Sequence, residues 1–452
     1  MKNKNIGIDL TEGNVFKTLI AFALPILLGN VFQQLYGFVD SMVVGRVLGE
    51  NTLAAVGSSF GISGIILAVA MGITIGIGII ISKMYGEGNK EKIQSAVDTG
   101  LWVVVLLGVF ITIFGIIKCN AFLKIFNVPM EIWNEAGSYL KITFIGVLPV
   151  FIYNACSNFL RGIGDSKTPL ILLIIAALMN VVLDILFVAV FQWGVEGAAI
   201  ATVVSQFFAF FACLYYVNKY NSYFKIRLKN AYFNFDIFKT GMTIGIPATL
   251  QQLFISLGSS VLQILINGFG PIYISGYTAA SKIDGFATMP AVNIGRAMSN
   301  YVAQNEGANK PDRVKKGIQA ACILLAVVSV FISFNIYLFA DKFILAFCDS
   351  DDVVKAGVEY LYIVSAFYII FSFMHILNGI LLGNGKSHIS MISTIVSFCL
   401  LQVPTAYFLS KSIGVIGIWI AAPVGWVGGF FIRLICYKNI QKRIGRFPGG
   451  QK

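Results

Sequence analysis

The chain has 452 residues, of which 57% are hydrophobic and only 12% are charged. Soluble domains carry roughly 25% charged residues, so this composition excludes a water-soluble enzyme, a disordered chain and a nucleic-acid-binding module. A bilayer-spanning helix uses about 20 apolar residues, so the apolar content suffices for twelve such helices. The sequence therefore predicts an integral membrane protein without enzymatic activity.

The net charge of +12 does not indicate a nucleic-acid partner, because the basic residues lie in short segments between apolar runs rather than on one face. The N-terminus is predicted to be a first membrane helix and not a signal peptide. Asp9 and Glu12 precede an apolar run that contains Pro25 and continues beyond the usual length of a signal sequence.

Apolar runs bounded by Lys, Arg, Gly and Asn predict twelve transmembrane helices. The spans predicted in the first half are Phe16–Gly45, Leu53–Ile81, Gly100–Ile117, Leu140–Leu160, Leu170–Phe191 and Ala198–Val217. Those predicted in the second half are Phe238–Ile266, Ser275–Ala303, Ile318–Phe339, Tyr360–Leu382, Ile389–Leu409 and Ile413–Tyr437.

The distribution of basic residues predicts the orientation. With the N-terminus in the cytoplasm, the segments on that side hold 23 Lys and Arg residues, and the opposite segments hold 7. Cytoplasmic loops of membrane proteins are enriched in these residues. We therefore expect a multi-pass protein of the cell membrane with both termini in the cytoplasm.

The sequence repeats itself with an offset of about 220 residues. FKTLIAFALPILL at Phe16 matches FKTGMTIGIPATL at Phe238, which aligns Pro25 with Pro247 and predicts a shared helix kink. LRGIGDSKT and GVEGAAIATVV likewise match LLGNGKSHI and GVIGIWIAAPV. Two six-helix copies in the same orientation are a transporter architecture, with the substrate near the midplane between them.

The repeat divides the chain into four predicted parts. Residues 1–217 form an N-terminal lobe, and residues 218–237 form a cytoplasmic linker between the lobes. Residues 238–437 form a C-terminal lobe, and residues 438–452 form a basic cytoplasmic tail.

Ionisable residues inside predicted spans are functional candidates, because they are costly to place in a membrane. They are Asp40, Asp184, Lys282, Asp284, Arg296 and His375. Asn180 and Asp184 are four residues apart, so they share one helix face, as do Tyr36 and Asp40. Oxygens of Asp, Asn and Thr suit a Na⁺ or H⁺ site, and Thr202 belongs to a similar row on the sixth span.

The second copy keeps neither acid: Asp40 aligns with about Leu262, and Asp184 aligns with Thr405. The shared scaffold therefore does not demand them, and cation coupling is expected in the first lobe. Lys282 and Asp284 are two residues apart and should not pair. His375, with Asn378 three residues later, is interpreted as a hydrogen-bonded core histidine, with a titrating or substrate-contacting role as the alternative.

Taken together, these motifs resemble the multidrug and toxic compound extrusion (MATE) family over nearly the whole chain. The resemblance rests on LPILLGNVFQQLYGFVDSMVVGRVLG in the first span, MYGEGNKEK after the second, RGIGDSKTP after the fourth, and their shortened copies. It implies an all-α membrane protein with twelve helices in two lobes around a V-shaped central cavity.

The resemblance also implies site residues. The branch of the family with acids in the N-terminal lobe builds its cation site from positions that match Asp40, Asn180, Asp184 and Thr202. Of these, Asp184, Asn180 and Thr202 are the expected Na⁺ ligands. The implied substrate cavity includes positions matching Gln34, Tyr36, Tyr139, Asn154 and Asn158, and His375 and Asn378 are candidates in the second lobe.

The expected function is efflux of amphipathic, often cationic organic compounds in exchange for Na⁺ or H⁺, by a monomer in the lipid bilayer that needs no cofactor. The sequence does not separate the two ions, because the same oxygens serve both. The alternative is a lipid-linked saccharide flippase of the same superfamily, in which Lys282 and Arg296 would hold a pyrophosphate.

Overall fold

The computed structural model describes residues 7–126, 128–226, 232–347 and 350–444, and over these residues the protein is helical with no β-strand. The helices of the first half are α1 (Val15–Leu48), α2 (Glu50–Gly86), α3 (Lys90–Ile117), α4 (Cys119–Ile125), η1 (Met130–Ile132), α5 (Trp133–Ile145), α6 (Val147–Gly162), α7 (Lys167–Asp184), η2 (Ile185–Val190) and α8 (Gly194–Tyr220). Those of the second half are α9 (Phe235–Asn267), α10 (Pro271–Gly307), α11 (Pro311–Leu345), α12 (Asp351–Ser365), α13 (Tyr368–Gly383), α14 (Ser387–Ile395), η3 (Val396–Gln402), α15 (Val403–Ile413) and α16 (Ile416–Ile444).

The number of membrane-crossing helices agrees with the predicted fold. In the described part of the chain, nine helical segments are long and apolar enough to cross a membrane, and two bent helix pairs raise the number to eleven. The remaining long helix is α10, which has 37 residues and is less apolar because it carries Lys282, Asp284 and Arg296. With α10, the order of elements is that of two six-helix copies.

Two predicted spans are broken helices. The predicted span Leu140–Leu160 is part of a pair bent by 45° between α5 and α6, and Tyr360–Leu382 is part of a pair bent by 54° between α12 and α13. The first break has a local cause, because Pro149 has no N–H to donate to the carbonyl group one turn earlier. By contrast, α1 and α9 continue through Pro25 and Pro247, so a bend at these prolines stays a prediction.

Apolar side chains cover much of the outer surface, as lipid contact requires. On α11, Ile323, Val327, Phe331 and Phe334 are each more than 60% exposed. A soluble monomer rarely exposes so large a continuous apolar surface, so the exposed face of α11 fits a hydrocarbon environment.

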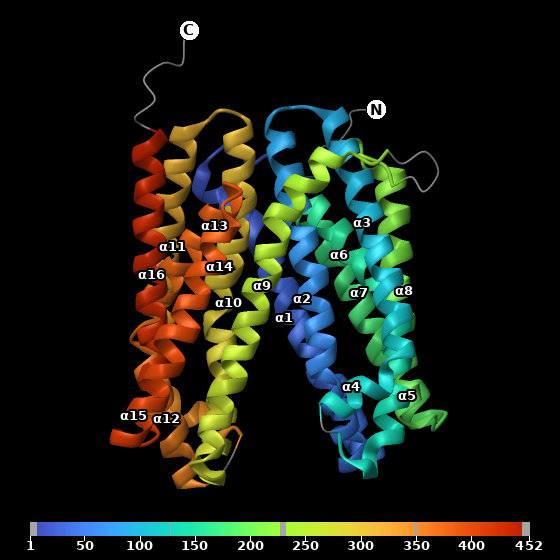
Figure 1. Cartoon of the computed structure of the whole chain (residues 1–452), viewed down its shortest axis with the longest axis vertical. Helices are drawn as coiled ribbons and strands as arrows, with labels where there is room; N and C mark the ends of the chain where they lie inside the picture. Colours follow the sequence, from blue (N-terminus) through green and yellow to red (C-terminus); the bar gives the residue numbers. More distant parts are fainter. Residues whose placement is uncertain (1–6, 127, 227–231, 348–349, 445–452) are drawn as a thin grey trace. The chain divides into compact units, whose positions relative to one another are not determined.

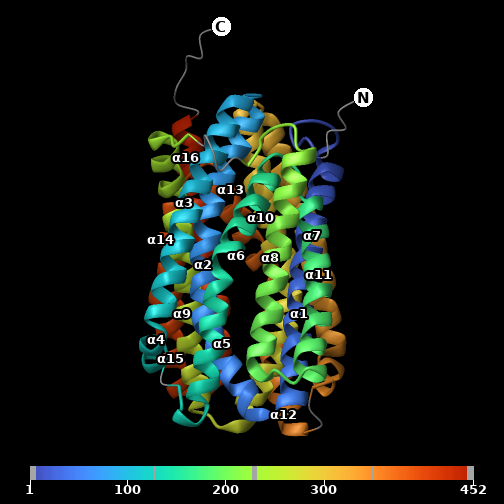
Figure 2. The ribbon, with the colours of Figure 1, turned by 90° about the vertical axis from the view of Figure 1, so that its right-hand side faces the viewer.

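Contacts between helices divide the chain into two units. Unit 1 contains Ile20–Thr249 and two short pieces, and unit 2 contains Leu250–Glu306 and Lys310–Lys452 with one short piece. In unit 1, α2 packs along α6 and α7 packs along α8 (Figure 2). In unit 2, α15 packs along α16, at the red end of the colour scale, and α11 contacts α12 (Figure 1).

The division falls inside α9 because the first part of this helix packs closely on α2. A Cβ atom added at Gly76 would lie 2.7 Å from the backbone nitrogen of Gly245. Glycines at positions 72 and 76 thus allow α9 to approach α2 closely. The four sequence-derived parts rest on the repeat rather than on contacts, and they stay predictions.

The segment RGIGDSKTP shapes the start of α7. Gly164 has a φ of +86°, and its carbonyl oxygen accepts a hydrogen bond from the Ile8 N–H at 3.0 Å. The Asp165 carboxylate accepts bonds from the Thr168 N–H at 3.0 Å and the Thr168 hydroxyl at 2.6 Å. Burial raises the pKa of Asp165 above its ordinary value, although the bonds from Thr168 act in the opposite direction.

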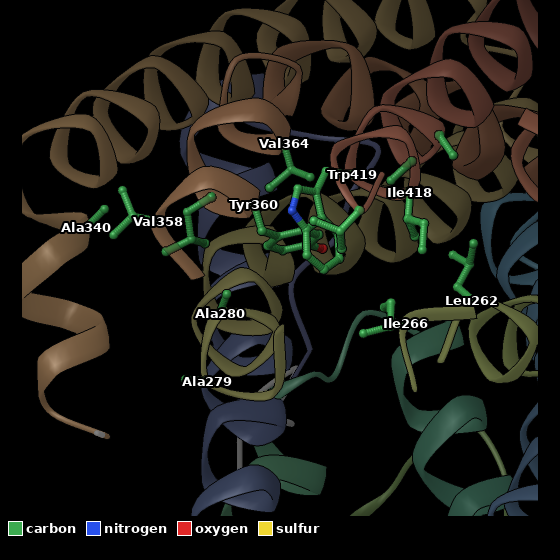
Figure 3. Close-up of a cluster of buried hydrophobic side chains, with 14 of the residues drawn as sticks. Leu262, Ile266, Ala279, Ala280, Ala340, Val358, Tyr360, Val364, Ile418 and Trp419 are labelled. Carbon is green, nitrogen blue, oxygen red and sulfur yellow. The ribbon is translucent and has the colours of Figure 1, made fainter. Parts of the chain in front are cut away.

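The core of unit 2 is built around aromatic residues. Trp419 on α16 is 1% exposed, and its ring lies 5.2 Å from that of Tyr360 on α12 and 5.5 Å from that of Tyr277 on α10. Figure 3 shows Trp419 and Tyr360 among aliphatic side chains, including Val364 and Ile418. This cluster joins α10, α12 and α16 into one layer of packing.

Elsewhere in unit 2, α10 and α13 touch through glycines, which leads to a stability prediction. A Cβ atom at Gly379 would overlap the Gly295 carbonyl oxygen and lie 3.0 Å from its carbonyl carbon. We expect Gly379→Ala to lower the free energy of unfolding of the purified protein by about 1–3 kcal/mol, the range typical of overpacking. The thermal unfolding midpoint should fall accordingly. Gly285→Ala is the control, because nothing lies within 4 Å of its Cβ position. Equal midpoints for both variants would contradict the prediction.

Candidate functional site

Two buried acids meet inside unit 1. Asp40 on α1 is 7% exposed, and Asp184 at the end of α7 is fully buried. Their carboxyl groups lie close enough to interact with each other. The structure thus brings together two residues that are 144 positions apart in the sequence.

A change of helix type positions Asp184. The α-helical hydrogen bonding of α7 ends at this residue, and the chain continues as the π-helical segment η2. π-Helical turns are rare and occur frequently at functional sites. Asn180 lies one turn before Asp184 and is 2% exposed, so the carboxyl and amide groups enter the same interior region.

The oxygens of this group lack hydrogen-bond donors. The Asn180 amide donates to the Thr202 hydroxyl at 3.4 Å. Four buried oxygens accept no hydrogen bond, namely Asp40 Oδ1, Asp184 Oδ1, Asp184 Oδ2 and Asn180 Oδ1. Buried polar atoms are normally satisfied, so the arrangement calls for a proton or a cation at these oxygens.

Within the described ranges, neither of the two acids forms an ion pair with a basic side chain. The ion pairs of Lys92 with Glu87 and of Lys315 with Asp312 involve exposed side chains elsewhere. Tyr36 and Tyr139 interact electrostatically with both carboxyl groups. Tyr139 belongs to a small apolar cluster with Val188, Val195 and Ala198, among others.

The remaining residues predicted for the substrate cavity of the first lobe have separate contacts. Gln34 is exposed on α1. The Asn154 amide donates to the Val150 carbonyl at 2.9 Å, and the Asn158 amide donates to the Thr74 hydroxyl at 2.8 Å. Asn158 therefore joins α6 to α2, and its role in substrate binding stays a prediction.

In unit 2, Asn378 and His375 are half-buried on α13. The Gln251 amide donates to the Asn378 side-chain oxygen at 3.1 Å and to the Thr394 hydroxyl at 3.1 Å. The His375 ring lies 4.5 Å from that of Phe371. No hydrogen bond to the His375 ring occurs within the described residues, so its expected hydrogen-bonded role is not supported.

Asp284 is held by two tyrosines. Its carboxylate accepts a hydrogen bond from the Tyr368 hydroxyl at 2.7 Å and a longer one from the Tyr360 hydroxyl at 3.4 Å. The two tyrosines lie on either side of the break between α12 and α13, so the bend directs both hydroxyls to one acid. Lys282 lies instead over the Phe347 ring, at 5.9 Å, which agrees with the expectation that it does not pair with Asp284.

Sequence reasoning overlooked Arg433 on α16, which is only 3% exposed. Its guanidinium donates to the Thr394 hydroxyl at 2.7 Å, the Gly429 carbonyl at 3.2 Å and the Ser390 carbonyl at 3.5 Å. The signal was present, because Arg433 is a single charged residue inside the last predicted span.

Comparison with known sequences places this chain among membrane transporters. The sequence model of the MatE family matches residues 25–186 and again residues 247–408. The chain belongs to the MatE family. The two matches begin at the aligned prolines, Pro25 and Pro247, which confirms the internal repeat.

Individual relatives match this chain over almost the whole of its length. The probable multidrug resistance protein YpnP of Bacillus subtilis is 32% identical over 442 residues, which cover 97% of each chain. The probable multidrug resistance protein YoeA of Bacillus subtilis is 27% identical over 442 residues, or 96% of each chain. An outward-facing structure of a multidrug resistance MATE family transporter of the MOP superfamily has a TM-score of 0.91 at 23% identity, covering 99% of this chain and 100% of that one. This likeness establishes the two-lobe, twelve-helix fold.

The contact between Asp284 and Tyr368 yields a second prediction. We expect Tyr368→Phe to lower the stability of the purified protein by about 1.5–3 kcal/mol, the range for a hydrogen bond to a charged group. In the Asp284→Asn background the same change should cost less, which a double-mutant comparison of unfolding midpoints would measure. Tyr362→Phe is the control, because its hydroxyl makes only an exposed 3.4 Å bond to the Tyr337 carbonyl. Additive effects of the two substitutions would refute the interaction.

Proposed function

We propose that this MatE protein is a secondary active antiporter that exports amphipathic, often cationic organic compounds in exchange for Na⁺ or H⁺. The observation that carries the proposal is the group of four buried oxygens without donors at Asp40, Asp184 and Asn180. The names of the relatives, as multidrug resistance proteins, support the substrate class. They do not favour the lipid-linked saccharide flippase.

The oxygens fit either coupling ion. A proton would satisfy one carboxylate and let it donate to the other, whereas Na⁺ would take oxygens from Asp184, Asn180 and Thr202. Hard metal cations such as Na⁺ prefer oxygen ligands. The proposed site therefore depends on the carboxylate charge in both cases, and substitution by amides removes it in both.

Coupling requires that the ion bind one conformation better than the other, because equal affinity shifts no equilibrium. Asp184 lies where the α-helical bonding of α7 changes to π-helical bonding, and Asp40 lies on the same helix as Pro25. We propose that ion binding between α1 and α7 favours one arrangement of α1 and thereby displaces the exported compound. The excess of basic residues in alternate loops supports a cell-membrane orientation with both termini in the cytoplasm.

Replacing either acid should abolish transport. We expect cells expressing Asp40→Asn or Asp184→Asn to lose most resistance to ethidium and to export it at least tenfold more slowly than wild-type cells at equal protein levels. Asp312→Asn, on an exposed part of α11, should export ethidium normally. Wild-type export by both amide variants would overturn the coupling role.

Ion gradients should drive the same transport in vitro. In proteoliposomes, we expect either an imposed ΔpH or an imposed Na⁺ gradient to accelerate ethidium export by wild-type protein severalfold. The Asp184→Asn protein should not respond, because its site no longer exchanges a charge. Export that ignores both gradients would argue against an antiporter.

A further inference from the structure

A positive charge is buried in unit 2 without an acidic partner. Arg433 forms no ion pair with the described residues, and it donates its hydrogen bonds to hydroxyl and carbonyl oxygens. Arg433 and Arg296 both act electrostatically on His375, so a second positive charge lies near the same ring. Asp284 is already held by tyrosine hydroxyls. An isolated buried charge is unfavourable unless it is paired, so the surroundings of Arg433 favour a negative group.

Donors, rather than acceptors, are in excess around this arginine. Arg433 Nε is buried and has no hydrogen-bond partner, and neither does the Ser390 hydroxyl. The Thr394 hydroxyl oxygen accepts from both Arg433 and Gln251, at 2.7 and 3.1 Å. A hydroxyl has one proton to donate and two lone pairs, so the Thr394 proton remains available.

The backbone makes room for this group. A Cβ atom at Gly429, one turn before Arg433, would lie 2.8 Å from Arg433 Nη1 and 3.1 Å from the Met374 sulfur. Ser390, Thr394 and Ser397 lie on one face of α14 and η3, and all three are at most 4% exposed. Glycine on α16 thus allows the guanidinium to lie against a buried hydroxyl face.

The repeat shows that the arginine is not a requirement of the scaffold. In the register that aligns Gly194 with Gly414, Arg433 corresponds to Cys213 of the first copy. Cys213 is buried in unit 1 and is uncharged as a thiol. The same helical position therefore packs without a cation in one copy, whereas the other copy places a permanent cation there.

We propose that Arg433, Thr394 and Ser390 form an anion subsite that takes the carboxylate of an exported compound. This inference rests on the proposed efflux function. It specifies one class of exported compound, namely zwitterionic compounds with a carboxylate group. Guanidinium groups bind carboxylates through paired, charge-assisted hydrogen bonds, and Arg433 Nε has the free N–H that such a pair requires. Chloride offers the same negative charge and is the other source of an anion for this subsite.

The test compares two probes that differ in one charge. Norfloxacin carries a carboxylate and an amine, and its ethyl ester carries the amine alone. Binding of both to purified full-length protein in detergent is measured by the fluorescence of the probe, in a low-salt HEPES buffer that contains neither chloride nor a carboxylate. The variants are Arg433→Met and Arg433→Lys, and Lys282→Met is the matched control because it removes an exposed cation of the same unit.

We expect Arg433→Met to weaken binding of norfloxacin at least tenfold while changing binding of the ester and of ethidium less than twofold. Arg433→Lys should retain part of the preference, and Lys282→Met should retain all of it. In wild-type protein, but not in Arg433→Met, added chloride should weaken norfloxacin binding if chloride competes for the subsite.

Two results would overturn the subsite. Equal losses for the acid and the ester in both arginine variants would assign Arg433 a structural role, and unfolding midpoints would show the accompanying loss of stability. Unchanged binding of all three probes would also refute it. Neither result bears on ethidium export by the wild-type protein or its dependence on Asp40 and Asp184, so the antiport proposal stands or falls separately.

Discussion

The absence of water from the membrane interior is the constraint on which the rest of this structure depends. Every backbone group in that region must find a partner within the protein, and helices are the way in which one chain achieves this. The same constraint makes each buried polar side chain conspicuous. Unit 1 leaves carboxylate and amide oxygens without donors at Asp184 and Asn180. Unit 2 leaves a guanidinium N–H without an acceptor at Arg433.

The two copies have therefore kept one scaffold and diverged in charge. At aligned positions, the first copy has Asp184 where the second has Thr405, and the second has Arg433 where the first has Cys213. The aligned segments and their glycine contacts keep the helix packing similar in the two copies, whereas the buried polar residues differ between them. The acids Asp40 and Asp184 of unit 1 and Arg433 of unit 2 thus suit different parts of the proposed transport reaction, the former the coupling ion and the latter an anionic group.

Hydropathy, loop charge and the repeat were sufficient to predict the helical fold, because long apolar runs have few alternatives in a membrane. The same reasoning selected Asp40 and Asp184, since acids in apolar runs are rare. It did not locate the breaks at the start of α6 and α13, because the predicted spans run through both as continuous apolar segments. It also could not pair Asp284 with Tyr360 and Tyr368, because these partners lie on a different part of the chain and tyrosines are common in apolar segments.

The hydrogen bonds of Tyr360 and Tyr368 restrict the relative motion of α12 and α13. Tyr360 belongs to α12 and Tyr368 to α13, and both hydroxyls converge on one carboxylate of α10. The angle between two helix segments can change freely only when no side chain binds both segments at once. Here Asp284 connects the two segments across the 54° bend through its hydrogen bonds with both tyrosines. Consequently, α10, α12 and α13 must move together as one rigid body. A change in the angle between α12 and α13 requires that a hydrogen bond to Asp284 first break.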